Sequence, residues 1–206
     1  MTPAHKDHTM ASLAHHFLTM AYNNAWANHR LLRACGQLSQ EDFVATRTSF
    51  FPSLKATLNH NLTVDWYYVD ALEHCVRGQP VNSAARSYFE PEEPCATCPE
   101  LYAAQCAVDH RLIQLCTALT EAQLDLPVAI QRSKGVKHET VTRLLAHLFQ
   151  HQIHHRGQAH AMLAGTRVKP PQLDEFFCDE DARIHALPEL AALGYAQAAI
   201  WGAASA

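Results

Sequence analysis

The sequence predicts an all-α protein, a four-helix bundle with an additional C-terminal helix. Apolar residues recur at helical spacing in four long segments, and we find no internal repeat and no strand-rich stretch. Polar or proline-bearing connections separate the four segments. We therefore expect one domain over residues 1–206, with the bundle core at about 12–165 and a C-terminal extension at about 166–206.

The first helix is predicted from about Ser12 to Leu38. Its apolar residues follow a helical pattern: Leu13, Phe17, Met20, Ala21, Leu31, Leu32, Cys35 and Leu38. Asn24 and Asn28 lie on much the same face, and buried amides need hydrogen-bond partners. The two amides therefore either brace another segment or lie at the rim in water.

The second helix is predicted from near Pro52-Ser53 to about Cys75, and it buries much of its circumference. One apolar stripe consists of Leu54, Leu58, Leu62, Val69 and Leu72. At about 100° per residue, a neighbouring stripe carries Ser53, Thr57, His60, Val64, Tyr67 and Ala71. Mostly small residues on this second stripe leave room for a ligand pocket beside His60.

The third helix begins at a recognisable cap. In Thr97-Cys98-Pro99-Glu100, threonine is the expected N-cap and glutamate follows three residues later, which is a capping box. After this helix, Val128 and Ile130 with the turn sequence Ser133-Lys134-Gly135 predict a short extended segment.

The fourth helix is predicted from about Glu139 to Ala164, with Gly165 as the residue that ends it. A last, alanine-rich helix is predicted over Pro188–Trp201, with no charged residue after Glu189. Its apolar face predicts a homodimer, because closed two-fold dimers are the commonest oligomers. That face consists of Leu190, Leu193, Ala198, Ile200 and Trp201. The alternative is that this face packs on the chain's own bundle.

Composition excludes several classes of protein. The formal net charge is −4 and no basic stripe is present, which argues against nucleic-acid binding. No apolar run is long enough to span a bilayer. Seven cysteines without a secretory signal favour reduced thiols and a cytoplasmic location.

Histidine is the compositional outlier, with 15 in the chain and five between His147 and His160. On the fourth helix His151 and His155 are one turn apart on one face, so that two imidazoles could reach one metal ion. His147 extends the row by a further turn, His154 lies to one side and His160 points to the opposite face. A histidine-rich helix also gives such pairs by chance, and they can be simply solvated.

A third ligand from another segment favours a metal site, and His60 is the natural candidate. Three neutral imidazoles would leave Zn²⁺, Ni²⁺ or a similar ion with its full double charge and an open coordination position. Such an ion lowers the pKa of a bound water or thiol. We therefore predict one divalent ion, with zinc or nickel favoured, at His60, His151 and His155.

Two other metal chemistries are disfavoured by the sequence. A zincin-type protease needs glutamate directly after the first histidine of the helix, and that position is Gln152. A bundle di-iron site needs Glu-x-x-His on two helices, and no glutamate here has histidine three residues later.

Three blocks of the sequence match a known family in residues and spacing. They are Tyr22-Asn23-Asn24-Ala25-Trp26-Ala27-Asn28, then Thr57-Leu58-Asn59-His60 followed by Asp65-Trp66, and finally His151-Gln152-Ile153-His154-His155-Arg156-Gly157-Gln158. Together they resemble the DinB family of the DinB/YfiT-like metalloenzymes. The resemblance covers most of the first 165 residues, and its last block is the most specific.

The resemblance implies an up-down-down-up four-helix bundle, a metal ion on His60, His151 and His155, and a homodimer. It also implies an enzyme of the wider superfamily's kind, a thiol-dependent S-transferase or isomerase that takes a low-molecular-weight thiol. If the ion activates water instead of a thiol, a hydrolase-like activity is expected. The alternative is a non-catalytic protein that binds a metal ion or a small molecule. Neither nucleic acid nor membrane is an expected partner.

Other residues have two interpretations each. Arg156 could steer an anionic substrate or pair with a carboxylate between helices, which is the commoner role. Asp65 could orient a ligand histidine or cap a neighbouring backbone. The C-x-x-C pair Cys95 and Cys98 starts a helix and does not follow a strand, so two unpaired thiols are expected.

Overall fold

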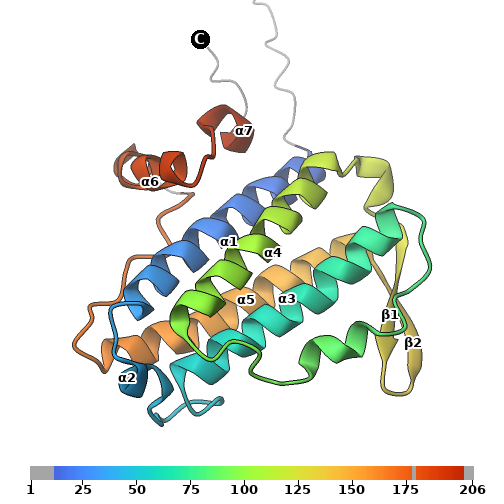
Figure 1. Cartoon of the computed structure of the whole chain (residues 1–206). Coiled ribbons are helices and arrows are strands. Elements are labelled where there is room, and N and C mark those ends of the chain that lie inside the picture. The colour runs from blue at the N-terminus through green and yellow to red at the C-terminus, as the bar shows by residue number, and fades with distance from the viewer. Residues whose placement is uncertain (1–11, 178–179, 202–206) are drawn as a thin grey trace, which may run out of the picture.

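The computed structural model describes residues 12–177 and 180–201, and it is mostly helical (Figure 1). The long helices α1, α3, α4 and α5 lie side by side, which confirms the all-α prediction. The α-helices are α1 Leu13–Cys35, α2 Gln40–Val44, α3 Leu54–Val76, α4 Cys98–Ala118, α5 Val141–Ala164, α6 Glu180–Ala192 and α7 Gln197–Trp201. Short 3₁₀ helices, η1 Ala85–Phe89 and η2 Glu121–Gln123, and the strands β1 Pro127–Arg132 and β2 Gly135–Thr140 complete the described elements.

Each long helix begins at a side-chain cap that the local sequence supplies. The hydroxyls of Ser12, Ser53, Thr97 and Thr140 accept a hydrogen bond from the backbone N–H three residues later. The predicted capping box is present, since Glu100 Oε2 also accepts from the Thr97 backbone N–H at 3.0 Å. The predicted starts of these helices are therefore correct to within about two residues, as far as helix ends can be defined.

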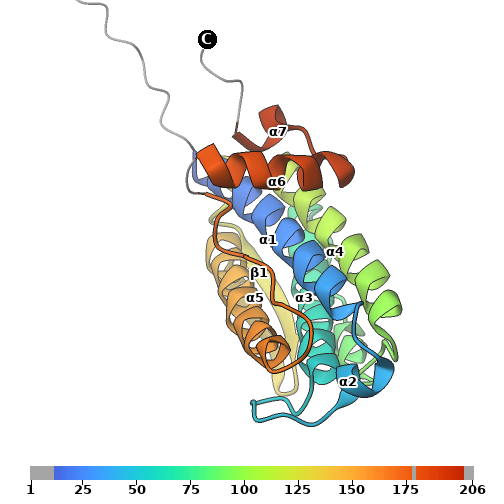
Figure 2. The same cartoon turned by 90° about the vertical axis from the view of Figure 1, so that its left-hand side faces the viewer.

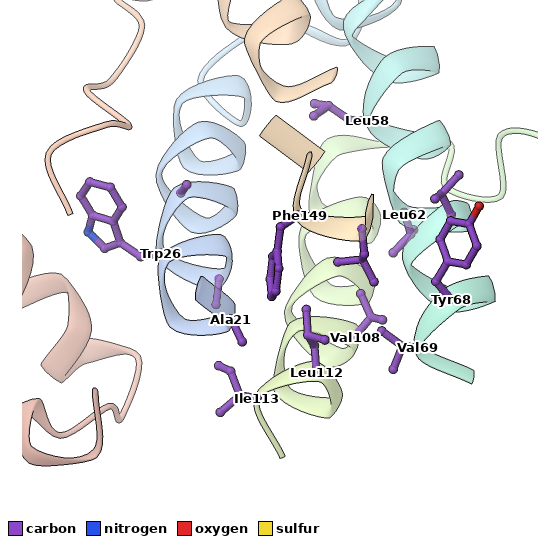
Figure 3. Close-up of a cluster of buried hydrophobic side chains, with 14 of the residues drawn as sticks. Ala21, Trp26, Leu58, Leu62, Tyr68, Val69, Val108, Leu112, Ile113 and Phe149 are labelled. Carbon is purple, nitrogen blue, oxygen red and sulfur yellow. The ribbon is translucent and has the colours of Figure 1, made fainter. Parts of the chain in front are cut away.

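The core lies between the four long helices (Figure 3). Helix α1 packs on α4, and α3 packs on both α4 and α5. Leu62, Val69 and Leu112 are almost fully buried between them. Burial of one such side chain contributes about 1.5–3 kcal/mol, so this core rather than helix propensity holds the bundle together.

The predicted extended segment is the hairpin β1–β2. Val128 and Ile130 are fully buried on one face of β1, and Gly135 has φ +105 at the turn. Val128 pairs with Glu139 in the ladder. Glu139 is therefore in a strand and Thr140 is the cap, which explains why α5 begins at Val141 and not at Glu139.

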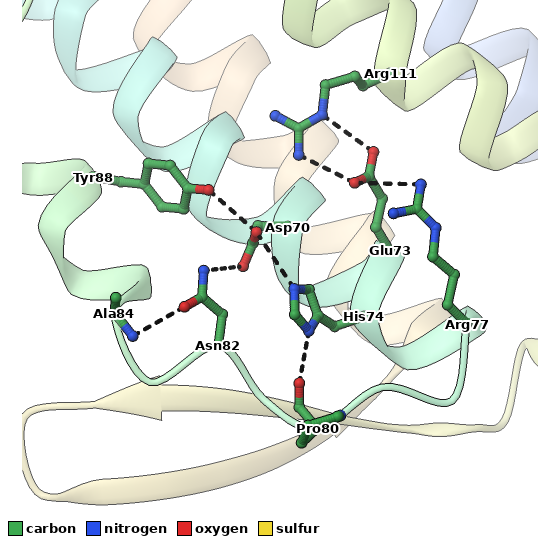
Figure 4. A network of polar contacts seen from close by, with 9 residues as sticks. All are labelled: Asp70, Glu73, His74, Arg77, Pro80, Asn82, Ala84, Tyr88 and Arg111. Carbon is green, nitrogen blue, oxygen red and sulfur yellow. Dashed lines mark hydrogen bonds and ion pairs between the residues drawn. The ribbon is translucent and has the colours of Figure 1, made fainter.

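A polar network ties the chain after α3 back onto that helix (Figure 4). Asp70 accepts hydrogen bonds from Asn82 Nδ2 and from the Tyr88 hydroxyl, both at 3.1 Å. Glu73 accepts from the Arg111 guanidinium at 3.1 and 3.2 Å and thereby joins α3 to α4. The network holds η1 against α3, and η1 carries Phe89 toward the histidines described below.

The C-terminal segment packs on α1 (Figure 2). Trp26 lies against Phe176 with ring centroids 5.6 Å apart, Tyr22 lies against Tyr195 at 5.1 Å, and Arg30 pairs with Glu189 at 3.2 Å. The segment therefore covers a face of the bundle within the same chain.

The predicted single helix over Pro188–Trp201 is wrong in its bounds. Pro188 lies inside α6, and the chain turns between α6 and α7 where Gly194 has φ +78. Glycine adopts this left-handed conformation without the steric cost that a Cβ brings, and it ends the helix there. Leu190 and Ile200, predicted for a dimer face, are buried within the chain.

No described helix is both long enough and apolar enough to cross a membrane.

Candidate metal centre

Three histidines from two helices converge at one place on the bundle. His60 comes from the middle of α3, and His151 and His155 come from successive turns of α5. One ring nitrogen of each lies within 4.8 Å of the others, and His60 Nε2 is 3.0 Å from His151 Nε2. The structure therefore brings together all three residues that the sequence predicts as metal ligands.

An aromatic ring and a cavity border the three histidines. The Phe51 ring lies 4.4 Å from that of His60 and 5.5 Å from that of His155, centroid to centroid. A cavity of about 330 Å³ opens beside His60, lined by Phe51, Ala56, His60, Thr63, Phe89, Glu92 and Glu93. Of the three histidines, His60 is thus accessible from a pocket that has both apolar walls and carboxylates. No pattern in the sequence pointed to Phe51, which precedes α3 in the chain.

Burial keeps the clustered imidazoles neutral. Burial and the neighbouring His155 lower the pKa of His60 to about 4. Burial and the surrounding histidines lower the pKa of His151 to about 3, and burial also lowers that of His155. Neutral imidazole is the form that binds a metal ion, so these three side chains are ready as ligands at neutral pH.

Only one of the α5 ligand candidates has a partner for its other ring nitrogen. His155 Nδ1 lies 2.8 Å from Gln158 Oε1, one turn further along α5, so that Nδ1–H can donate and Nε2 is left for a ligand role. His151 Nδ1 is buried and has no hydrogen-bond partner among the described residues. Gln158 was not predicted to have a role, although the i, i+3 spacing is a usable signal.

A buried polar layer lies directly behind the site. Asp109 on α4 accepts from Asn24 Nδ2 and Asn28 Nδ2, each at 3.1 Å. Arg156 Nη1 donates to Asn24 Oδ1 at 2.6 Å and to Asn28 Oδ1 at 2.8 Å. Asn24 and Asn28 therefore brace other helices, which was the first of the two alternatives, and they are not at a rim in water.

Asp65 belongs to the same layer. Its Oδ2 accepts from Gln105 Nε2 at 2.8 Å and from Gln152 Nε2. It therefore has neither of the two predicted roles, since it contacts side chains of α4 and α5 instead of a ligand histidine or a backbone N–H. Burial, together with Asp109, raises the pKa of Asp65 to about 7, and burial raises that of Asp109 to about 6.

Arg156 points into this layer and not into the ligand cavity. It is almost fully buried, and Asp109 and Asp65 favour its charge while burial lowers its pKa to about 10. The guanidinium does lie between helices, but its hydrogen bonds go to the amides of Asn24 and Asn28 and not, as predicted, to a carboxylate. A substrate-steering role is not supported, because α1 covers the guanidinium.

The remaining histidines lie as the helical wheel predicts. His147 is exposed, with its ring 6.1 Å from that of His151. His154 is exposed and contacts Gln158, and His160 Nε2 lies 2.9 Å from the Pro171 carbonyl oxygen. Cys95 and Cys98 are buried free thiols, as expected.

The donor set fits a divalent ion. Tetrahedral Zn²⁺ with Zn–N bonds of about 2.0–2.1 Å holds its ligand nitrogens roughly 3.3–3.4 Å apart. The 3.0 Å between His60 Nε2 and His151 Nε2 needs only a small adjustment to reach that value. Three neutral nitrogens, with no carboxylate or thiolate among them, leave room for an exogenous ligand.

Comparison with known proteins agrees with the three sequence blocks. Residues 10–186 match the DinB family. The chain is 26% identical over 143 residues to the protein named "Protein DinB" of Bacillus subtilis (strain 168), which covers 68% of this chain and 80% of that protein. The match to the family spans the four long helices and all three clustered histidines, and this chain belongs to the DinB family.

Proposed function

We propose that the chain binds one divalent metal ion, Zn²⁺ or Ni²⁺, through His60, His151 and His155 and is a metal-dependent enzyme. A thiol-dependent S-transferase is the activity we favour, with a hydrolase-like reaction as the second form. One observation carries the proposal: a cavity with carboxylates opens at His60, one of three converging, neutral imidazoles. A non-catalytic metal site would be expected to have a closed coordination sphere and a sealed apolar surround.

Each part of the cavity has a proposed task. The three imidazoles hold the ion and leave its charge uncompensated, while Phe51 and Phe89 keep water from part of the cavity wall. When bound, the ion lowers the pKa of a thiol or water that reaches it. Glu92 and Glu93 line the same cavity, and Glu93 pairs with Lys55 at 3.0 Å. Glu92 has no ion pair among the described residues, so it is the carboxylate available to accept a proton.

Metal content tests the first half of the proposal. Protein purified without a histidine tag should contain close to one divalent ion per chain by elemental analysis. A chain that is consistently metal-free and also rejects added Zn²⁺ and Ni²⁺ contradicts the proposal.

Turnover tests the second half. Metal-loaded protein should accelerate transfer of a low-molecular-weight thiol to an electrophile such as 1-chloro-2,4-dinitrobenzene. Metal-free protein and His151→Ala should not. A fully metal-loaded protein without turnover toward thiols or hydrolysable esters supports the alternative, a non-catalytic binding protein.

We also propose a homodimer, as the resemblance to the family implies. Two apolar residues of the C-terminal segment are used within the chain, but Ala196, Ala198 and Ala199 near α7 are exposed. Light scattering across a concentration series should give twice the chain mass of 23.0 kDa. A strictly monomeric mass at micromolar concentration assigns the C-terminal helices an intramolecular role only.

A further inference from the structure

A second cavity lies one helical turn from the three histidines. It has a volume of about 240 Å³ and is lined by Tyr68, Arg132, Glu139, Arg143, Leu144 and His147. The His147 ring lies 6.1 Å from the His151 ring and 5.4 Å from the Tyr68 ring. Since α5 rises about 1.5 Å per residue, His147 is roughly 6 Å along the helix from His151. The second cavity therefore lies within the length of a small molecule from His151.

The charges of the second cavity do not cancel. Arg143 Nε pairs with Glu139 Oε2 at 3.3 Å, and Glu139 is the only acidic residue in the lining. Arg132 makes no ion pair with a carboxylate among the residues that the structure describes. The lining therefore has one more guanidinium than carboxylate, even when His147 is neutral.

Tyrosines fix the position of the unpaired guanidinium. Arg132 Nη2 donates to the Tyr68 hydroxyl at 3.0 Å, and its Cζ lies 5.6 Å from the ring centroids of both Tyr67 and Tyr68. Arg132 ends β1, whose buried Val128 and Ile130 anchor that strand to the bundle. Arginine held in this way loses little further freedom when it binds an anion, because its planar fork is already oriented.

We propose that this cavity binds an anionic oxygen group, a carboxylate or a phosphate, through Arg132 and Arg143. The role of the cavity rests on the proposed function, because we assign the cavity as the subsite that binds the charged end of the enzyme's substrate. The substrate class is then a small thiol or ester with an anionic group several bonds from its reacting atom. The volume of about 240 Å³ has room for such a group.

The first experiment needs no metal ion and therefore fails independently of the proposed function. Inorganic phosphate and, separately, acetate are titrated into metal-free protein while the arginine Nε–H resonances are followed by NMR. We expect saturable shifts of the Arg132 resonance, with whichever of the two anions binds more tightly identifying the preferred group. In Arg143→Gln the affinity should fall about tenfold, which corresponds to about 1.4 kcal/mol. Linear shifts without saturation, or unchanged affinity in Arg143→Gln, overturn the proposal.

The second experiment connects the cavity to the histidines. Zn²⁺-loaded protein is titrated by calorimetry with 3-mercaptopropionate and with its uncharged analogue 3-mercaptopropanol. We expect the carboxylate to bind about tenfold more tightly, a preference of about 1.4 kcal/mol that disappears in Arg132→Gln. Glu139→Gln should increase the preference, because it removes the competing carboxylate.

The matched control is Arg77→Gln, which removes a guanidinium that is 60% exposed and lies at the end of α3. It should leave both titrations unchanged, and an equal loss there would mean a general charge effect and would overturn the proposal. Equal affinity of wild-type protein for the two thiols overturns the subsite while the metal proposal stands. Failure to load zinc contradicts the proposed function, and the phosphate and acetate titrations then decide the anion cavity alone.

Discussion

Neighbouring residues of α5 belong to two polar regions of opposite design. His151 and His155 face His60, and the ring nitrogens of the three histidines converge without a carboxylate ligand. Gln152 and Arg156, each one residue later, face the interior, where they bond to amides and a carboxylate of other helices. The step of about 100° per residue separates the two regions. The difference teaches that ring nitrogens converging on one point mark a ligand site, whereas amides and carboxylates bonded across helices mark a brace.

The buried layer is the region whose disruption should affect folding most. Arg156→Met leaves two buried carboxylates without their cation and the Asn24 and Asn28 carbonyl oxygens without a donor. We expect a loss of about 3–5 kcal/mol in the free energy of unfolding. Urea denaturation at pH 8 measures it, where both carboxyl groups tend to ionise. Arg143→Met, at a side chain that is 75% exposed, is the control and should change stability by less than about 0.5 kcal/mol. A similar, small effect of both variants would mean that the layer is not a brace.

The clustered histidines should instead govern metal affinity. His151→Ala should weaken Ni²⁺ or Zn²⁺ binding by at least about 100-fold. Even the loss of a hydrogen-bond partner of a metal-ligating histidine lowers metal affinity by about 10–100-fold, and this variant removes the ligand itself. His160→Ala should change it little, since that ring bonds to the Pro171 carbonyl on another face. The metal affinity of His154→Ala should lie between those of His151→Ala and His160→Ala. Competitive titration with a chelating dye gives the three affinities, and equal values for positions 151 and 160 would show that the assignment of the ligand face is wrong.

A variant at Gln158 tests whether a hydrogen bond to the second ring nitrogen of a ligand histidine raises the metal affinity of this site. Gln158→Leu removes the acceptor 2.8 Å from His155 Nδ1 and frees the imidazole to rotate. We expect metal affinity to fall about tenfold with little change in unfolding free energy. Gln150→Leu, at an exposed position of the same helix, serves as the matched control. If the two leucine variants bind metal equally well, the contact with Gln158 does not orient His155.

The pH dependence of stability should have opposite signs in the two regions of the metal-free protein. His60 and His151 have pKa values of about 4 and 3, below the value of 6.5 for an unperturbed histidine. Between those values the unfolded chain binds more protons, so their contribution to stability is present above pH 6.5 and is lost as the pH falls. Asp65, with its pKa raised to about 7 from 3.8, binds more protons when folded. Its contribution is therefore present at acid pH and is lost as the pH rises from about 4 to 7.

Two variants separate these contributions. His151→Ala should flatten the loss of stability as the pH falls from 6.5 to 4, and Asp65→Asn should flatten the loss as the pH rises from about 4 to 7. Urea denaturation of metal-free protein in steps from pH 4 to 8 provides the measurement, with each variant compared with the wild type at every pH. If Asp65→Asn leaves the pH dependence between 4 and 7 as it is, the carboxyl group of Asp65 titrates at an ordinary pH and the buried layer is more polarisable than the structure indicates.

The sequence alone determined the features that depend on near neighbours in the chain. The start of α4 followed from the capping box at Thr97, because a cap acts on an N–H three residues away. The shared face of His151 and His155 followed from their spacing of one turn. The three blocks that resemble the DinB family also identified the family correctly.

Only the tertiary structure decided which distant residues meet. Asp109 and Gln105 had no signal in the sequence, yet they complete the buried layer from α4. Asp65 could not be assigned a partner from its distance to His60 along the chain, and Phe51 covers the histidines from a connecting segment. The break at Gly194 likewise depends on how the C-terminal segment packs on α1. Local hydrogen bonds and spacing fix a helix and the faces of its side chains, but the rotation and register of four helices set the contacts between them, and those follow from packing the whole core.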